Sequence, residues 1–470
     1  MAKATLGLIV GNRDFFPSRF VTEGRNDLLQ LFKEMDIEAV VIDEKDSNLG
    51  GVETRADSKI CGDLFKKNAD KIDGVLVVLP NFGNEQGIAD TMRISGLKVP
   101  ILIQAYPDDL HKMDLNGRRD SFCGKFSACN VLRQYGITYT LTTLHTVHPK
   151  SESFKKDLEK FVAVCKVVKG LKNARLGAIG ARPDAFKTVR FSEKIFEHHG
   201  ISVSTVDLSW ILGKASRLKD SDSKVVHKLD EINGYVNTQK VPATALMKMA
   251  KLGLVIDEWM TDNDINATAL QCWDSIQQNY GVNACSLMSI MGEKLLPSAC
   301  EVDVAGVLGM YALTLASGKP SALVDWNNNY MEDANKCVIF HCGNYPKSFF
   351  DDNVEMDIAD VLGTTLGNEN VYGALDGRVP GGPLTYARVS TDDVNGKIRT
   401  YFGEGRFTDD DIPTFGARGV LEIPNMQGLL HNLCKQGFEH HVGISKSYVA
   451  DILEEAFGAY LGWDVYYHKG

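Results

Sequence analysis

The clearest hydrophobic pattern lies in residues 301–341, where a helical repeat is followed by two short apolar runs. Apolar side chains three and four residues apart predict a helix from an N-capping Asp303 to about Ala316. The runs 321–324 and 336–340 are short and apolar, which is typical of strands buried in a parallel sheet. This stretch therefore predicts a helix followed by two strands.

Three polar side chains stand where these predicted elements begin or end. Glu301 comes just before the helix, while Asp325 and His341 end the two strands. Ligands of open α/β sheets bind beyond the carboxyl ends of the strands, and two carboxylates with an imidazole suit a divalent cation such as Mn²⁺. An aspartate that caps a loop and a hydrogen-bonded core histidine give the same pattern, so both interpretations stay open here.

Upstream, strand and helix patterns alternate through residues 1–168, which predicts a doubly wound parallel sheet. We expect the loops after its strands to line one edge, with Arg13 in the first loop. A long amphipathic helix at 150–170 leads into a second α/β region, residues 169–350, which carries Glu301 and Asp325. Within that region the patterns also predict helices at 184–199, 221–239, 242–253 and 266–278, and a strand at 285–290.

The pattern changes after about residue 350, where short alternating runs are separated by Gly, Pro and Asp turns. This spacing predicts a small antiparallel β-barrel domain at 351–470 that ends in a helix. Its candidate strands are 381–388, 397–402, 419–423 and 438–444.

The last of these runs contains two adjacent histidines. Neighbours on a strand face opposite ways, so only one of them is expected to point into a given site. His440 would share its face with the apolar Val442 and Ile444, and His441 would share its face with Glu439. On this argument His441 is the better metal ligand.

Composition narrows the class of protein. The chain has 470 residues, of which 44% are hydrophobic, and a formal net charge of −10. The negative charge argues against nonspecific binding to nucleic acid or to anionic membranes. Ten cysteines without a CxxC pair indicate reduced thiols in a cytoplasmic enzyme. No signal peptide and no membrane-spanning run is predicted from the sequence.

Several of these residues, with the segments that flank them, resemble those of a known protein family. Glu301 and Asp325, followed far downstream by a histidine in a C-terminal β-domain, resemble the L-fucose isomerase family. The segments SACEVDVAG, SALVDW and GGPLTYAR also resemble that family. His341 departs from its pattern and instead resembles a fourth metal ligand of the related L-arabinose isomerases. The resemblance covers the chain well from about Gly292 onward, and the earlier part matches mainly in its αβ layout.

The resemblance implies a fold of two flavodoxin/Rossmann-like domains followed by a β-barrel. It also implies an aldose–ketose isomerase that uses Mn²⁺ or another divalent cation. The assembly is expected to be a homotrimer or homohexamer with sites between subunits. Glu301, Asp325 and His441 would bind the metal, with Glu301 and Asp325 as the catalytic acid/base pair. The residues expected to bind substrate are Arg13, Trp326, His341, Asn344 and His440.

The substrate would be a hexose, deoxyhexose or pentose whose proton moves between C1 and C2 through an enediol. One alternative is an anionic sugar, such as the sulfonated hexose sulfoquinovose. That substrate would need a cationic pocket, for which Arg13, Arg378, Arg388 and Arg418 are candidates. An alternative of another class is a non-enzymatic sugar-binding protein, since two αβ domains in tandem also build such proteins.

Overall fold

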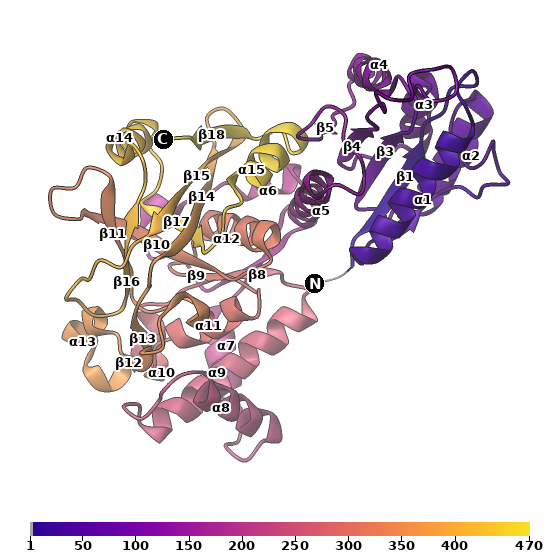
Figure 1. Cartoon of the computed structure of the whole chain (residues 1–470). Helices are drawn as coiled ribbons and strands as arrows, with labels where there is room; N and C mark the ends of the chain where they lie inside the picture. The colour runs from indigo at the N-terminus through magenta and orange to yellow at the C-terminus, as the bar shows by residue number, and fades with distance from the viewer. Residues whose placement is uncertain (1–2) are drawn as a thin grey trace. The chain divides into compact units, whose positions relative to one another are not determined.

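Five parallel strands in the order β2-β1-β3-β4-β5 form the first sheet of the computed structural model, which describes residues 3–470 (Figure 1). This sheet belongs to unit 1, which comprises the described residues through Lys169 together with Glu455–Gly462. Its elements are β1 (Thr5–Val10), α1 (Arg19–Glu34), β2 (Glu38–Val40), α2 (Arg55–Lys67), β3 (Gly74–Leu79), α3 (Glu85–Ser95), β4 (Ile101–Ala105), α4 (Ser121–Gln134), β5 (Thr140–Leu141) and α5 (Glu152–Lys172).

Alternating side chains of this sheet enter two separate cores. Leu8 packs with side chains of α1 and α5, whereas the adjacent Ile9 packs with side chains of α2, α3 and α4. Because neighbouring residues of a strand face opposite ways, helices cover both faces of the sheet. The predicted doubly wound parallel sheet is therefore present in unit 1.

Unit 2, which comprises Gly170–Glu454 and Trp463–Gly470, begins with a second parallel sheet in the order β7-β6-β8-β9. In an open sheet of this kind, the carboxyl ends of the strands are the usual place for a site. The elements are β6 (Arg175–Ile179), a 3₁₀ turn (Lys187–Val189), α6 (Glu193–His198), β7 (Ser202–Val206), α7 (Leu208–Arg217), α8 (Ser223–Tyr235), α9 (Ala243–Asp262), β8 (Ala267–Leu270), α10 (Ser275–Tyr280), α11 (Cys285–Glu293), β9 (Ser298–Ala299) and α12 (Val304–Ser317).

An antiparallel barrel follows. Strands β16, β11, β10, β17, β14 and β15 pair in that order, and β15 pairs again with β16 to close the ring. These strands are β10 (Ser321–Asn329), β11 (Lys336–His341), β14 (Gly382–Asp392), β15 (Lys397–Phe407), β16 (Ala417–Glu422) and β17 (His441–Ser445). The predicted fold class, two parallel-sheet α/β regions and a C-terminal antiparallel barrel, is confirmed.

The remaining elements lie around the barrel strands or belong to unit 1. Strands β12 and β13 extend the sheet beyond β16, and β18 extends it beyond β15. Their bounds, with those of the remaining helices, are Lys347–Phe349 (3₁₀), β12 (Glu355–Ile358), α13 (Asp360–Leu366), Asn368–Asn370 (3₁₀), β13 (Tyr372–Arg378), α14 (Met426–Gln436), α15 (Ala450–Glu454), Glu455–Tyr460 (π-helical) and β18 (Asp464–His468). Among residues 3–470, no helix has both the length and the apolar character needed to cross a bilayer.

Three local predictions are wrong. The runs 321–324 and 336–340 are neighbouring antiparallel barrel strands, not parallel strands. The run 285–290 is part of α11, and the predicted helix at 266–278 is strand β8 followed by α10. The runs 285–290, 321–324 and 336–340 are short and apolar, and periodicity alone neither assigns such runs to a strand type nor distinguishes them from a buried helix.

Helix α12 connects the second parallel sheet to the barrel. Asp303 caps it as predicted, because its Oδ1 accepts the Gly306 backbone N–H at 2.8 Å. A side chain at Gly306 would meet Asp303 Oδ2 at 2.3 Å and Arg388 Nη1 at 2.7 Å. Glycine at this position therefore lets the first turn of α12 lie directly against a buried ion pair.

Candidate active site

Glu301, Asp325 and His441 converge at the junction of the second parallel sheet and the barrel. The Nε2 atom of His441 lies 3.7 Å from Glu301 Oε2 and 3.4 Å from Asp325 Oδ1. His441 and Glu301 are buried, while the Asp325 side chain keeps 26% of its surface exposed. Residues far apart in the sequence thus place two carboxylates around one imidazole nitrogen.

Different elements position the two carboxylates. Glu301 follows β9, and both Glu301 and Val302 adopt left-handed backbone, with φ of 54° and 56°. Such a conformation costs a non-glycine residue about 1–3 kcal/mol and tends to occur at functional sites. Asp325 lies within β10, directly across from His441 on β17, so the register of the barrel holds these two side chains together.

A buried chain of charges orients His441. Its Nδ1–H donates to Asp303 Oδ2 at 2.8 Å, because a carboxylate can only accept. The neutral ring therefore presents a free lone pair at Nε2, which is the arrangement of a metal-ligating histidine backed by a carboxylate. Arg388 donates to both oxygens of Asp303, at 2.5 and 3.1 Å, and through Nε to Glu439 Oε2 at 3.2 Å.

This chain of charges shifts the pKa values of its members. Burial opposes ionisation of Asp303, but the charge of Arg388 and the hydrogen bond from His441 hold the pKa of Asp303 well below its usual value. Burial works against protonation of His441, yet Asp303, Glu301 and Asp325 together raise the pKa of His441. Asp303 is therefore a permanent anion beneath the imidazole.

His341 approaches the cluster from β11 in a different tautomer. The backbone N–H of Cys342 donates to His341 Nδ1 at 2.9 Å, so a neutral His341 carries its proton on Nε2. This Nε2 lies 3.9 Å from Glu301 Oε2 and has no hydrogen-bond partner. In this geometry His341 is a donor facing the cluster, whereas His441 is an acceptor.

His440 also reaches the cluster, which corrects the expectation that only one histidine of the pair would do so. Its Nε2 lies 3.4 Å from Asp325 Oδ1, and 42% of its side chain is exposed. The strand β17 begins only at His441, so the alternation of a strand does not apply to His440. Burial and the neighbouring His441 lower the pKa of His440.

The atoms that face one another here lack other partners. Glu301 Oε2, Asp325 Oδ1 and His341 Nε2 are buried without a hydrogen bond. Such atoms are costly unless something bound to the protein satisfies them. Neighbouring ligands of an octahedral cation at about 2.1 Å lie about 3 Å apart, close to the spacing around His441 Nε2. The residues present therefore suit a divalent cation.

The other predicted substrate-binding residues have partners of their own within the protein. The Trp326 indole N–H donates to Tyr401 OH at 2.9 Å inside the barrel. Asn344 is buried beside Cys300, whose sulfur accepts from its Nδ2 at 3.4 Å. Arg13 belongs to unit 1, where its Nε donates to the Gly83 carbonyl at 2.8 Å and its Nη2 pairs with Glu85.

Unit 2 contains a cavity of about 790 Å³ whose wall includes none of the five cluster residues. Val302 and Glu439, the chain neighbours of Glu301 and His440, contribute to its wall. The loop after β6 supplies the cations Arg182, Lys187 and Arg190, and the cavity is also lined by four carboxylates, Glu193, Asp392, Asp393 and Glu439. The same loop places the Phe186 ring with its centroid 5.5 Å from those of both His440 and His441.

The arginines that the sequence suggested for an anionic sugar are engaged elsewhere. Arg388 is fully buried against Asp303 and Glu439. Arg378 donates to the Asp409 carbonyl at 2.7 Å, and Arg418 pairs with Asp376 at 2.8 Å. The expectation that they face a sugar is not supported by these contacts.

Three side chains that help to build the site were not identified as such from the sequence. Sequence reasoning assigned Arg388 no structural partner, placed Trp273 in a helix, and did not single out Phe186. In the structure the Trp273 indole N–H donates to Glu301 Oε1 at 2.8 Å. The position of Asp303 two residues after Glu301 was the available signal, because a buried aspartate needs a cation or a donor.

Two family models match most of the chain between them. Residues 7–172 match the model described as fucose/sulfoquinovose isomerase, N-terminal domain, and residues 339–469 match L-fucose isomerase, C-terminal domain.

Named relatives agree with these matches. A sulfoquinovose isomerase of Priestia aryabhattai is 23% identical over 405 residues, covering 84% of this chain and 85% of the relative. That of Alkalicoccus urumqiensis is 23% identical over 367 residues, covering 76% and 77%. The sulfoquinovose isomerase of Clostridium sp. (strain MSTE9) is 25% identical over 232 residues, covering 48% of this chain and 50% of the relative. Among solved structures, unliganded arylmalonate decarboxylase matches at 11% identity with a TM-score of 0.15, too low to bear on fold or function.

Proposed function

Since the chain belongs to the fucose isomerase family and is an aldose–ketose isomerase, we propose that it acts on an anionic, sulfonated hexose of the sulfoquinovose type. Family membership sets aside the alternative of a non-enzymatic sugar-binding protein. The observation that carries the chemistry is the group of buried, unpartnered atoms Glu301 Oε2, Asp325 Oδ1 and His341 Nε2 beside His441 Nε2.

The proposed substrate rests on the cations of the cavity whose wall includes Val302 and Glu439. Arg182, Lys187 and Arg190 come from one loop, and Phe186 of the same loop lies against His440 and His441. A sulfonate on the sugar's distal carbon would be attracted by these cations while C1 and C2 lie at the carboxylates. The names of the relatives point to the same substrate.

Glu301, Asp325 and His441 would hold the divalent cation, for which Mn²⁺ suits two carboxylates and an imidazole. When bound, the cation stabilises the negative charge that develops on the sugar oxygens. Asp303 keeps the His441 lone pair turned toward the cation, and Arg388 keeps Asp303 ionised.

Glu301 and Asp325 are the proposed acid/base pair. One carboxylate takes the proton from C2 of the aldose and returns it to C1, while the other takes the proton of the C2 hydroxyl and gives it to the C1 oxygen. Trp273 fixes the Glu301 carboxyl group by donating to Oε1, which leaves Oε2 directed at the cluster. The Nε2–H of His341 can donate to a sugar oxygen, which agrees with its predicted role in substrate binding.

A substrate screen tests the proposal. Purified enzyme with Mn²⁺ would be assayed with sulfoquinovose, the matching unsulfonated aldose and a 6-phosphorylated aldose. We expect the highest kcat/KM for the sulfonated sugar. Arg190→Gln should raise KM for that sugar and leave turnover of a neutral aldose unchanged, with Arg378→Gln as the matched control. Equal kcat/KM for sulfonated and neutral sugars would contradict the proposed substrate.

A neutral aldose such as L-fucose is the second candidate. It is supported by the match of residues 339–469 to the C-terminal domain of L-fucose isomerase. The screen separates the two, because a neutral substrate gains nothing from Arg182, Lys187 and Arg190.

We also propose that the enzyme is a homotrimer or homohexamer in the cytoplasm. Unit 1 exposes aromatic side chains: Phe126 is 61%, Phe122 50% and Phe15 73% accessible. Exposed apolar clusters of this kind often mark interfaces. Light scattering of the full chain should give a mass of three or six copies, and Phe126→Glu should lower it. A monomeric wild-type mass would contradict this proposal.

A further inference from the structure

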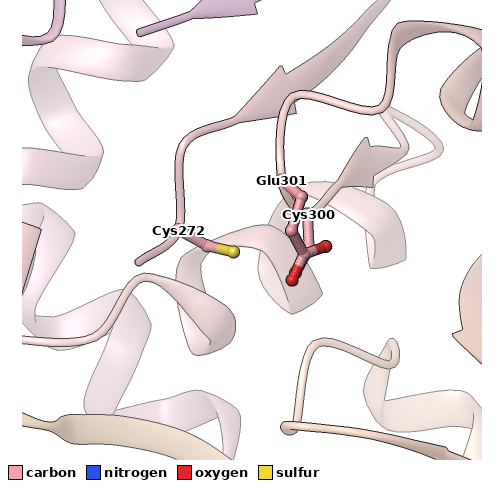
Figure 2. A group of neighbouring side chains, drawn as sticks. All are labelled: Cys272, Cys300 and Glu301. Atoms are coloured by element: carbon pink, nitrogen blue, oxygen red, sulfur yellow. The ribbon is translucent and has the colours of Figure 1, made fainter. Parts of the chain in front are cut away.

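Two buried thiols lie beside Glu301, and the isomerase reaction has no use for them. A sulfur of Cys272, a sulfur of Cys300 and a carboxylate oxygen of Glu301 lie within 4.8 Å of one another. Cys272 is 5% exposed and Cys300 is 0% exposed. In Figure 2 the Cys272 sulfur points from the loop after β8 toward the loop that carries Cys300 and Glu301.

The parallel sheet fixes this arrangement. Strands β8 and β9 are neighbours, with Ala269 paired to Ala299, so Cys272 and Cys300 emerge from adjacent carboxyl ends. The paired strands therefore hold the starts of the two loops that carry Cys272, Cys300 and Glu301 next to each other.

A polar wall adjoins the thiols. Asn344 is buried, its Nδ2 donates to Cys300 Sγ at 3.4 Å, and its Oδ1 has no partner. Met288 Sδ lies 4.0 Å from Cys300 Sγ. An unpartnered amide oxygen in a buried position indicates that a group can be bound beside the thiols.

We propose that Cys272, Cys300 and Glu301 form a second metal site, selective for a thiophilic cation such as Zn²⁺ or Cd²⁺. Two thiolates bound at about 2.3 Å to a tetrahedral ion lie about 3.8 Å apart, which the observed spacing allows. Soft sulfur ligands select Zn²⁺ over Mn²⁺, whereas carboxylate and imidazole ligands suit Mn²⁺. Binding releases the two thiol protons to solvent and changes no oxidation state.

The proposed thiol site and the proposed Mn²⁺ site share Glu301, so a metal bound at one site affects binding at the other. A thiophilic cation that recruits the Glu301 carboxylate removes it from His441 and Asp325. Filling the thiol site would therefore weaken Mn²⁺ binding and inhibit the isomerase. This second step rests on the proposed function, whereas formation of the thiol site does not.

The alternative is that both cysteines only fill space in the core. Buried cysteine often behaves as a small apolar residue, and in that case it would bind no metal. A space-filling role predicts that alanine and serine variants change stability but no metal-dependent signal. The metal-site proposal and the space-filling alternative therefore differ in whether Cd²⁺ produces a thiolate-to-cadmium absorption band.

The experiment uses the full chain with Cys123→Ser and Cys434→Ser as background, because both of those thiols are exposed. Metal-free protein is titrated with Cd²⁺ while the thiolate-to-cadmium charge-transfer absorption is followed. We expect one equivalent of Cd²⁺ to saturate the band. Cys272→Ser and Cys300→Ser should each weaken it roughly tenfold or more in affinity. Cys337→Ser, a buried thiol on β11, is the matched control and should keep the band.

A second arm measures competition. Titration of the Mn²⁺-loaded protein with Cd²⁺ should release Mn²⁺, detected by electron paramagnetic resonance, and the release should need higher Cd²⁺ in Cys272→Ser. No saturable band, or a band unchanged in both cysteine variants, would overturn the site. A normal band without Mn²⁺ release would overturn the competition. A normal band in a protein without isomerase activity would refute the proposed function alone.

Discussion

Two groups of buried charges in unit 2 differ in how completely their atoms are paired. Asp303, Arg388 and Glu439 satisfy one another, with Ser390 Oγ donating to Glu439 Oε1 at 2.8 Å. Glu301 and Asp325, a few ångströms away across His441, each leave a buried oxygen without a partner. The first group is complete within the protein, whereas the second requires something bound to it.

The fully paired group supports the structure of the site, whereas the unpaired group is the one that can bind a ligand. A buried ion pair with all its hydrogen bonds holds neighbouring groups in place, and its members have no unpaired donor or acceptor left for a ligand. Unpaired carboxylate oxygens that face one imidazole lone pair are poised for a cation or a proton. His441 joins the two groups, because its Nδ1 faces Asp303 and its Nε2 faces Glu301 and Asp325.

Removal of an unpaired carboxylate should have the largest effect. Glu301→Gln and Asp325→Asn should each lower kcat by about 10²–10⁴, because proton transfer by a positioned carboxylate contributes that much. Steady-state kinetics with saturating Mn²⁺ measures this loss. Asp376→Asn, a carboxylate paired with Arg418, is the control and should retain activity. Near-normal turnover in a folded Glu301→Gln protein would exclude Glu301 as a base.

Loss of the paired cation should mainly affect stability. Arg388→Met leaves Asp303 and Glu439 as buried, uncompensated carboxylates, which should destabilise the fold by about 3–5 kcal/mol. Arg418→Met removes a partly exposed pair and should cost about 0–1 kcal/mol. Urea unfolding of both variants measures the difference. Equal losses would show that burial of the Asp303 network does not matter.

Removing the charge of Asp303, which is joined to the unpaired carboxylates through His441, should have an intermediate effect, on metal affinity. Asp303→Asn keeps an oxygen for the cap of α12 but removes the charge that orients His441. Metal affinity should fall about 10–100-fold, as for other carboxylate partners of ligating histidines. Competition with a fluorescent chelator measures it. Unchanged affinity would mean that His441 needs no carboxylate behind it.

A buried cation without a carboxylate partner should give the smallest effect. In unit 1, Lys125 Nζ donates only to Thr142 Oγ1 at 2.6 Å and the His145 carbonyl at 2.9 Å, and burial lowers the pKa of Lys125 to about 8. Between about pH 8 and its ordinary value of about 10.4, the unfolded chain binds more protons, so stability should rise with pH. Urea unfolding across this window should show the rise, and Lys125→Met should remove it.

Sequence patterns were sufficient for the layers of the fold but not for the strand that carries Asp325. Alternating strand and helix signals identified both parallel sheets, and the turn-rich spacing identified the barrel. The run 321–324 looks the same in a parallel sheet and in a closed barrel, since both bury it on two faces. Its partner β17 lies more than a hundred residues downstream, and no local signal encodes that pairing.

The same limit applies to the site. Glu301, Asp325, His341, His440 and His441 were named from their positions and from the resemblance, and the structure brings them together. Arg388 and Trp273 were missed because their roles depend on contacts with Asp303 and Glu301 that are made only in the folded chain. The left-handed backbone at Glu301 is likewise invisible in a sequence where glycine does not mark it.

The most direct test is a Mn²⁺ titration of metal-free protein by isothermal calorimetry. Wild-type protein should bind one Mn²⁺ for each chain, and Asp325→Asn and His441→Gln should each weaken that binding by at least about tenfold. His440→Gln should change it little, because His440 is half-exposed and lies outside the proposed ligand set. Unchanged Mn²⁺ affinity in both the Asp325 and His441 variants would contradict the proposal that these residues hold the cation.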